Sequence, residues 1–171
     1  ILAERATVAG PNSVRLASGK EVTAKIILIA VGAWPGIPNI PGAEHGITSN
    51  EIFHLDALPK RVVIAGAGYI ANEFAGVFHA FESKVSLITR GNRMLRSYDS
   101  EIVDRLVAMT EAKGIGVHFN FPCATITKQA DGSLLLDGGA QGSIETDMLV
   151  FAIGRTPKTE GLGLEAAGVE L

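Results

Sequence analysis

Cysteine is nearly absent from this sequence, since Cys123 is the only one among 171 residues. A single thiol cannot form a disulfide within the chain, which excludes a redox-active cysteine pair among these residues. There is also no signal-peptide pattern and no disulfide framework, and we therefore expect a protein of the reducing cytoplasm.

Long apolar runs and an excess of one charge are also missing. The longest apolar run covers residues 26–34, far short of the roughly twenty residues that cross a bilayer. The net charge is −3, so we expect no nucleic-acid and no membrane partner. No residue is assigned to a metal. The 20 glycines and 7 prolines indicate many turns, which favours one or two compact α/β domains over a helical bundle.

The most informative stretch is residues 61–73, RVVIAGAGYIANE. Its β-branched residues 62–64 predict a buried strand, and Gly66, Gly68 and Ala71 then give the spacing G-x-G-x-x-A. In a dinucleotide-binding turn the first glycine permits the tight turn and the second lets backbone approach a pyrophosphate, while the alanine lets the helix pack closely on the strand. The same spacing also fits a turn that binds nothing, so the surrounding pattern has to decide.

A helix and a second strand follow in the order that a dinucleotide-binding unit requires. Apolar residues recur at helical spacing and predict one buried helix face, made of Ile70, Phe74, Val77, Phe78 and Phe81. Residues 85–88 then predict the second strand. Strand, glycine turn, helix and strand within about thirty residues form a βαβ unit, in which the start of the helix favours phosphate.

The loop after the second predicted strand indicates which nucleotide binds. An NAD site carries a carboxylate about twenty residues beyond the glycines, where it accepts the ribose 2′-hydroxyl. Thr89 stands at that place, and residues 83–98 contain no carboxylate. Arg90 and Arg96 are suited to grip a 2′-phosphate, with Arg93 as a possible third contact. A solvated basic loop is the alternative, but the missing acid favours NADPH over NADH.

The flanking segments predict antiparallel meanders and one more long helix. The expected elements are strands at 2–9, 14–16 and 21–31, a proline-rich crossing at 34–42, a short helix capped by Ser49, a helix that starts at Asp99 or Ser100 and ends at Lys113 and Gly114, and strands at 115–119, 124–128, 133–137, 142–145 and 148–153. The long helix is expected to bury Ile102, Val103, Leu106, Val107 and Met109.

Residues 28–35 match residues 150–157 in pattern, LIAVGAWP against VFAIGRTP. Each copy follows a predicted meander, so we interpret both as exit strands of nucleotide-binding domains. Only the second domain has its glycine turn in the sequence, and we expect the chain to be a fragment of a larger protein with two such domains. Chance similarity of two buried strands is the alternative.

Three motifs resemble the flavoprotein disulfide reductases, that is, the class I pyridine nucleotide-disulfide oxidoreductases, and among them the bacterial glutathione reductases. They are GAGYIANE at 66–73, LRSYD at 95–99 and AIGRTP at 152–157. The resemblance implies an α/β fold, with a Rossmann-like NADPH-binding domain at 61–154 that contains a parallel sheet, helices and an antiparallel meander. Residues 1–42 and 155–171 would be partial segments of an FAD-binding domain, and 43–60 a connector.

The resemblance also implies an activity for the whole protein. A homodimeric enzyme carrying FAD would pass a hydride from NADPH to the flavin, then electrons to a dithiol and to a small-molecule disulfide. This chain alone should bind NADPH without catalysing the reaction. Mercuric reductase stays open as an alternative, dihydrolipoamide dehydrogenase is disfavoured by its use of NAD, and a non-catalytic nucleotide-sensing module is a further possibility.

The resemblance assigns site residues by position. Tyr69 would cover the nicotinamide pocket, and Glu73, one helical turn further on, would orient the carboxamide. The alternative is that Tyr69 is an ordinary exposed aromatic residue at the start of a helix and that Glu73 is a solvated acid in its first turns. The residues expected along the cofactors are Gly66, Gly68, Ile70, Ala71, Arg90, Arg96, Gly154 and Gly32. Val31 departs from the family pattern, which has threonine there.

Overall fold

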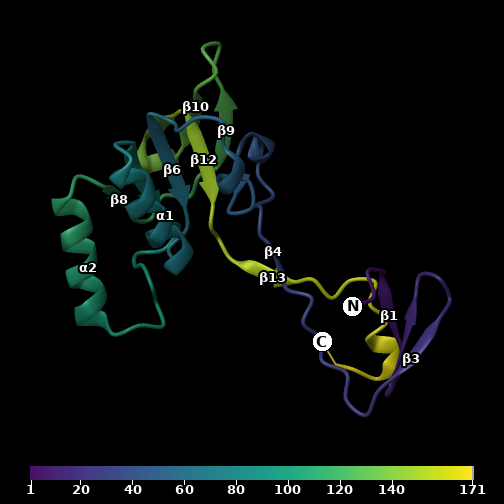
Figure 1. The fold of residues 1–171 in the computed structure, drawn as a ribbon. Helices are drawn as coiled ribbons and strands as arrows, with labels where there is room; N and C mark the ends of the chain where they lie inside the picture. The colour runs from purple at the N-terminus through teal and green to yellow at the C-terminus, as the bar shows by residue number, and fades with distance from the viewer. Residues whose placement is uncertain (171) are drawn as a thin grey trace. The chain divides into compact units, whose positions relative to one another are not determined.

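The computed structural model describes residues 1–170, and the chain divides into two compact units (Figure 1). The larger unit comprises residues 35–155, and the smaller one combines residues 1–34 with the chain from residue 156 onward. Within the described residues, no helix combines the length and the hydropathy that a membrane span needs. The mixed α/β class expected from the sequence is confirmed.

A parallel sheet forms the centre of the larger unit, with strand order β5–β12–β6–β7–β8. Its strands are β5 (Ile47–Thr48), β6 (Arg61–Ala65), β7 (Lys84–Ile88), β8 (Gly116–His118) and β12 (Met148–Phe151). The chain runs outward from β6 through β7 to β8 and then returns to the opposite side of β6 as β12. The segment 43–60 contributes β5, which pairs with β12, and 3-10 turns at Ala43–His45 and Ile52–His54.

Helices cover one face of this sheet, and an antiparallel meander covers the other (Figure 1). The helices are α1 (Tyr69–Ala80) and α2 (Ser100–Ala112), and the meander is β9 (Thr125–Lys128), β10 (Leu134–Asp137) and β11 (Ser143–Thr146), with a 3-10 turn at Gly139–Gln141 between the last two. In β6, Val62 and Ile64 pack with the helices, whereas Val63 and Ala65 pack with the meander. A strand that is apolar on both sides is buried on both, because successive side chains point to opposite faces.

The buried faces of both helices are narrower than the sequence predicted. The fully buried side chains are Ala71, Ala75 and Phe78 in α1 and Val103 in α2. The residues of the predicted faces that are exposed instead are Val77, Phe81, Ile102, Leu106 and Met109. The prediction was wrong for these five because a helix that lies on a sheet through small residues contacts it along one stripe, and apolar residues beside that stripe stay at the surface.

The start and the end of α2 agree with the sequence. Asp99 caps the helix, since its Oδ1 accepts hydrogen bonds from the backbone N–H groups of Glu101 and Ile102 at 3.0 and 3.2 Å. Lys113 is the C-terminal cap, and Gly114 follows with φ +90°. A side-chain cap at the start and backbone hydrogen bonds followed by a positive-φ glycine at the end therefore fix this helix locally.

The cap predicted at Ser49 is wrong. The helical turn there begins only at Ile52 and has no side-chain cap. Glu51 instead folds back, and its Oε2 accepts hydrogen bonds from the Thr48 N–H and hydroxyl at 2.8 and 2.6 Å. The bond from the Thr48 hydroxyl is the main reason why the pKa of Glu51 is lowered.

The smaller unit contains an antiparallel sheet of β1 (Ala6–Gly10), β2 (Ser13–Leu16) and β3 (Glu21–Thr23), with a 3-10 turn at Glu165–Ala167. The strand predicted over 21–31 is wrong beyond Thr23, because residues 24–32 have no strand assignment and Ile26 and Leu28 are 85% and 84% exposed. An apolar run forms a buried strand only where neighbouring strands pair with its backbone. In the described chain the Ala24 N–H donates to the Asn12 carbonyl and the Gly32 carbonyl accepts from the Lys158 N–H, but residues 25–31 between these two bonds belong to no strand pair.

The internal repeat ends in a two-stranded ribbon rather than in two similar exit strands. Strand β4 (Ala33–Pro35) pairs with β13 (Arg155–Pro157). Two bonds flank this pairing, from the Gly36 N–H to the Gly154 carbonyl and from the Lys158 N–H to the Gly32 carbonyl, both 2.9 Å long. Because 32 corresponds to 154 and 36 to 158 in the repeat, the two bonds are equivalent to each other. The two copies therefore pair with one another.

Candidate nucleotide-binding site

The candidate site lies at the carboxyl edge of the parallel sheet. Gly66 follows the end of β6, Arg90 comes two residues after β7, and Ile153 comes two residues after β12. The direction of sheet growth reverses between β6 and β12. In open α/β sheets the crevice at such a reversal is where ligands bind, so the topology brings these three distant segments to one binding edge.

The two glycines of the turn are needed for different reasons. Gly66 has φ +153°, and a Cβ at this position would collide with the carbonyl group of Ala152, 2.8 Å from its carbon. Gly68 has φ −89°, and a Cβ there would meet no described atom within 4 Å. The fold itself therefore requires Gly66, whereas Gly68 leaves its backbone open to a close approach, as a pyrophosphate site needs.

The first turn of α1 is available to an anion. Gly68 occupies the cap position, and no side chain of the described residues caps the helix. The side-chain amide of Asn72 donates to the Gly68 carbonyl at 2.9 Å. The N–H groups of the first turn and the positive end of the helix dipole are suited to bind phosphate.

Arg90 and Arg96 supply positive charge at this edge. Both are exposed, and neither has a hydrogen bond or ion pair with a residue of the described chain. The Leu95 N–H donates to the carbonyl of Ala67 at 2.8 Å, which holds the arginine loop against the glycine turn. The Arg96 guanidinium packs onto Gly91, where a Cβ would collide with it. Two unpaired guanidinium groups beside an uncapped helix start have the charge and the donors that would suit a doubly charged phosphate.

Arg93 is directed elsewhere. Its Nη2 lies 3.8 Å from Oδ1 of Asp104 on α2. It is not among the residues that line the cleft between the glycine turn and the arginine loop. The arrangement therefore does not support Arg93 as a third phosphate contact.

These groups line one cleft of about 750 Å³, which we call the carboxyl-edge cleft. The site residues named from the sequence that line it are Gly66, Gly68, Tyr69, Ile70, Arg90, Arg96 and Gly154. Three others do not line it. Ala71 is completely buried on the side of α1 that packs on the sheet, Glu73 is exposed one turn beyond Tyr69, and Gly32 lies in the smaller unit with φ +75°.

Sequence reasoning did not assign a role in the site to several residues that the cleft includes. They are Ala67, Gly91, Leu95, Ser97, Tyr98, Ala152, Ile153 and Arg155. Leu95, Ser97 and Tyr98 belong to the LRSYD motif, and their position beside Arg96 in that motif was the available signal. Ile153 belongs to the AIGRTP motif and precedes Gly154, which was assigned, but only the pairing of β12 with β6 brings it to the glycine turn.

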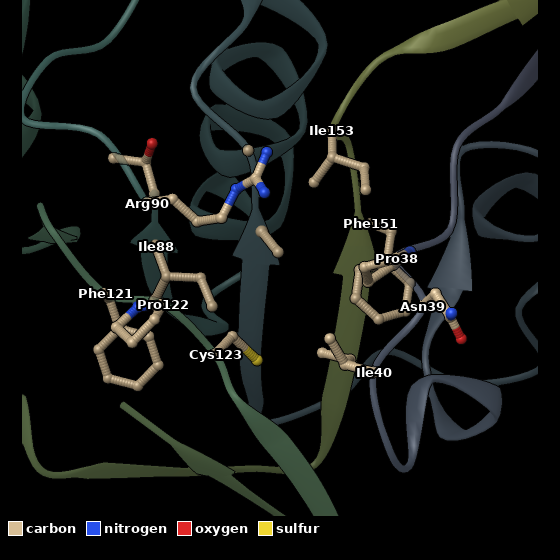
Figure 2. Close-up of a pocket in the computed structure, with 13 residues that line it drawn as sticks. Pro38, Asn39, Ile40, Ile88, Arg90, Phe121, Pro122, Cys123, Phe151 and Ile153 are labelled. Atoms are coloured by element: carbon tan, nitrogen blue, oxygen red, sulfur yellow. The ribbon is translucent and has the colours of Figure 1, made fainter. Parts of the chain in front are cut away.

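A second cavity of about 320 Å³ adjoins the cleft and shares Gly66, Arg90 and Ile153 with it (Figure 2). We call it the strand-end pocket. Cys123, which is 7% exposed, lines its wall. Burial, helped by the negative charge of Asp137, raises the pKa of the Cys123 thiol to about 11. The thiol is therefore neutral at pH 7 and poorly suited to act as a nucleophile.

Comparison with known proteins agrees with this geometry. A protein-family model described as pyridine nucleotide-disulphide oxidoreductase matches residues 1–171. The chain belongs to this family. The resemblance carried by the three sequence motifs is thereby confirmed.

Curated relatives of this pyridine nucleotide-disulphide oxidoreductase include glutathione reductases. The glutathione reductase of Nostoc sp. is 40% identical over 172 residues, which cover 100% of this chain and 37% of the relative. That of Schizosaccharomyces pombe is 44% identical over 156 residues, which cover 90% of this chain and 34% of the relative. The chain thus spans little more than a third of the length of these relatives.

Solved structures of the family share the fold. The HOCl-induced flavoprotein disulfide reductase RclA from Escherichia coli matches with a TM-score of 0.86 and 27% identity over 98% of this chain and 39% of its own. LpdA from Mycobacterium tuberculosis matches with a TM-score of 0.83 and 25% identity over 99% of this chain and 39% of its own. Both support the description of a family member with a Rossmann-like sheet.

Proposed function

We propose that this chain is the NADPH-binding part of a flavin-dependent disulfide reductase. The observation that carries the proposal is the pair of unpartnered guanidinium groups, Arg90 and Arg96, beside the glycine turn. No carboxylate stands at the end of β7, where an NAD site would have one. A carboxylate there would repel a 2′-phosphate, whereas two arginines bind it through charge-assisted hydrogen bonds.

The residues present fit the phosphate groups of a dinucleotide. The open backbone at Gly68 and the uncapped first turn of α1 would hold the pyrophosphate, and Arg90 and Arg96 would hold the 2′-phosphate. NADPH supplies a hydride from its nicotinamide ring when bound. Tyr69, which lines the cleft, would cover that ring, and Glu73 would orient its carboxamide from the next helical turn.

Flavin chemistry is assigned to the whole protein rather than to this chain. The smaller unit has no glycine turn comparable to residues 66–71 within its described residues. The assignment of Gly32 to a flavin-binding segment therefore remains a prediction.

For the whole protein we propose a cytoplasmic homodimer that carries FAD and reduces glutathione disulfide. The names of the curated relatives support this substrate. The similarity to RclA, a disulfide reductase that is not named a glutathione reductase, favours another electron acceptor as the second candidate. Activity of the whole protein with each acceptor distinguishes the two.

Parallel titrations of the chain with NADPH and NADH test the nucleotide assignment. We expect NADPH to bind about tenfold more tightly or better, because two charge-assisted contacts are made only with the 2′-phosphate. Replacing Arg90→Glu together with Arg96→Glu should abolish this preference, and Thr89→Glu should shift it towards NADH. Arg105→Glu, a charge reversal on the exposed side of α2, is the matched control. Equal affinities for both nucleotides in the unmodified chain contradict the proposal.

A further inference from the structure

We propose that a pocket at the amino edge of the parallel sheet binds a small phosphate monoester. The cavity encloses about 420 Å³, which lies within the range for small-molecule sites. Its lining comes from the first residues of β6 and β7, from β8, and from residues 143–146 of the meander. None of these residues lines the carboxyl-edge cleft or the strand-end pocket. We call this cavity the amino-edge pocket, and its ligand does not depend on the proposed nucleotide.

The strand register gathers polar residues on the sheet face that the meander covers. Ser86 pairs with Val63 on one side and with Gly116 on the other, so the three lie in one row across the sheet. Val63 packs in the core on the meander side, which places the row on that face. Lys84 and His118 lie two residues from the row in their own strands and therefore point to the same face. A face that is apolar at Val63 thus carries an ammonium, a hydroxyl and an imidazole at this edge.

The fold does not use these three polar side chains. Among the described residues, Lys84, Ser86 and His118 have no side-chain hydrogen bond and no ion pair. Lys84 is exposed, whereas Ser86 and His118 are half-buried. A partly buried polar group that lacks a partner loses hydration without a compensating bond. A ligand that accepts hydrogen bonds would supply the missing partner.

Gly116 leaves a hollow between two of these side chains. A Cβ at this position would lie 3.0 Å from Nε2 of His118 and 3.1 Å from Oγ of Ser86, so both polar atoms border the same small space. An imidazole, a hydroxyl and the ammonium of Lys84 can each donate a hydrogen bond. A phosphate monoester has three acceptor oxygens, one for each of these donors.

The charges of the pocket favour an anion. Its charged lining residues are Arg61, Lys84 and Glu145. Nη1 of Arg61 lies 2.6 Å from Oε1 of Glu145, and the same guanidinium pairs with Asp147, so the charge of Arg61 is compensated. Lys84 is the uncompensated charge of the lining, and an anion beside it gains Coulomb energy. Ile144, which packs against the core under the meander, offers an apolar wall to the organic group of the ester.

Calorimetric titration with phenyl phosphate tests the site. The full chain carries Arg90→Glu and Arg96→Glu in this experiment, so that the carboxyl-edge cleft does not bind the same probe. We expect saturable binding at one site, which Lys84→Ala weakens about tenfold or more. Lys128→Ala, which removes an exposed lysine outside the pocket, is the matched control and should change the affinity less than about twofold. No binding, or equal losses in the two lysine variants, would overturn the proposal.

Two further variants test the location without changing the charge. The backbone at Gly116 has no positive φ, so Gly116→Ala fits the strand and places a methyl group in the hollow beside His118. Ser86→Ala removes a donor that the fold does not use and should leave the urea midpoint nearly unchanged. We expect each to weaken phenyl phosphate about fivefold. Unchanged affinity in Ser86→Ala would place the probe elsewhere and refute the assignment.

Benzoate tests the ligand class with the same ring and a different anion. Its carboxylate has two oxygens and a single charge, so we expect it to bind the same variant about tenfold more weakly than phenyl phosphate. Equal affinities for benzoate and phenyl phosphate would contradict the assignment to a phosphate monoester.

Discussion

At the scale of single residues, Gly66 and Gly68 belong to the same motif, but they differ in how much space a side chain would have at each position. A side chain at position 66 would collide with the backbone of Ala152, whereas one at position 68 would enter open space. Gly66→Ala should therefore lower the free energy of unfolding by about 1–3 kcal/mol, measured by urea denaturation. Gly68→Ala should leave it nearly unchanged and weaken only nucleotide binding. Equal destabilisation by both substitutions would contradict this distinction.

Asp147 gives the chain a testable dependence on pH. The Arg61 guanidinium donates to its carboxylate, with Nε 3.0 Å from Oδ1, and this bond is the main reason why the pKa of Asp147 falls below 3.8. Because the folded pKa is the lower one, the stabilisation is fully present above pH 3.8 and is lost as the pH falls through the folded value. Asp147→Asn should lower the urea midpoint at pH 7 modestly, and this difference should shrink below pH 3.8.

The control for this prediction is Asp56→Asn. Asp56 is exposed and has no polar partner in the part of the chain that the structure describes. Its replacement should leave the urea midpoint nearly the same at both pH values. A difference between Asp147→Asn and the unmodified chain that persists unchanged at pH 3 would refute the role of the Arg61 contact.

The sequence predicted which residue types lie near the site, but it did not predict the direction in which each side chain points. The loop at 89–96 predicted a basic cluster, and Arg90 and Arg96 do line the cleft. Arg93 has the same chemistry and lies between them, yet it is directed to Asp104. Which guanidinium faces the cleft depends on where α2 lies, and no local pattern contains that information.

At the scale of elements, the start of α2 is determined by a residue next to it in the sequence. Asp99 accepts two backbone hydrogen bonds at its start, so Asp99→Ala should lower the free energy of unfolding by about 1 kcal/mol. Ser100→Ala, the adjacent change, removes no capping hydrogen bond of this helix and should cost much less. Thermal or urea unfolding monitored by circular dichroism measures both, and equal losses would argue against the cap.

The boundaries of elements were therefore more predictable than their buried faces. Strands β6 and β7, the end of α2 and the meander strands lie where turn and capping residues placed them. Ile102 and Met109 are exposed although they continue an apolar stripe, because burial depends on what packs against the helix. Residues 24–32 likewise do not form the predicted strand, because a strand needs a neighbouring strand to pair with its backbone.

At the scale of the whole molecule, the buried cores are unevenly distributed. Both hydrophobic clusters lie entirely within residues 35–155, while the buried hydrophobic side chains described in the smaller unit are Leu16, Leu162 and Leu164. A polypeptide of residues 35–155 should therefore unfold cooperatively within a few degrees of the full chain, because burial of apolar surface is the main stabilising contribution. It should also retain NADPH affinity within about twofold. Differential scanning calorimetry and nucleotide titration check both expectations, and a loss of cooperative unfolding would contradict them.

The sequence by itself determined the glycine turn, the order of strands and helices around it, the missing acid after β7 and the membership of a family. Each of these depends on residue types at short spacings, which act through local sterics and charge. The tertiary structure decided which helix residues are buried, which arginines face the cleft, and that Ile153 and Cys123 lie near the glycine turn. Those outcomes depend on the register of parallel strands that are far apart in the chain, and a contact between distant segments exists only once the sheet has assembled.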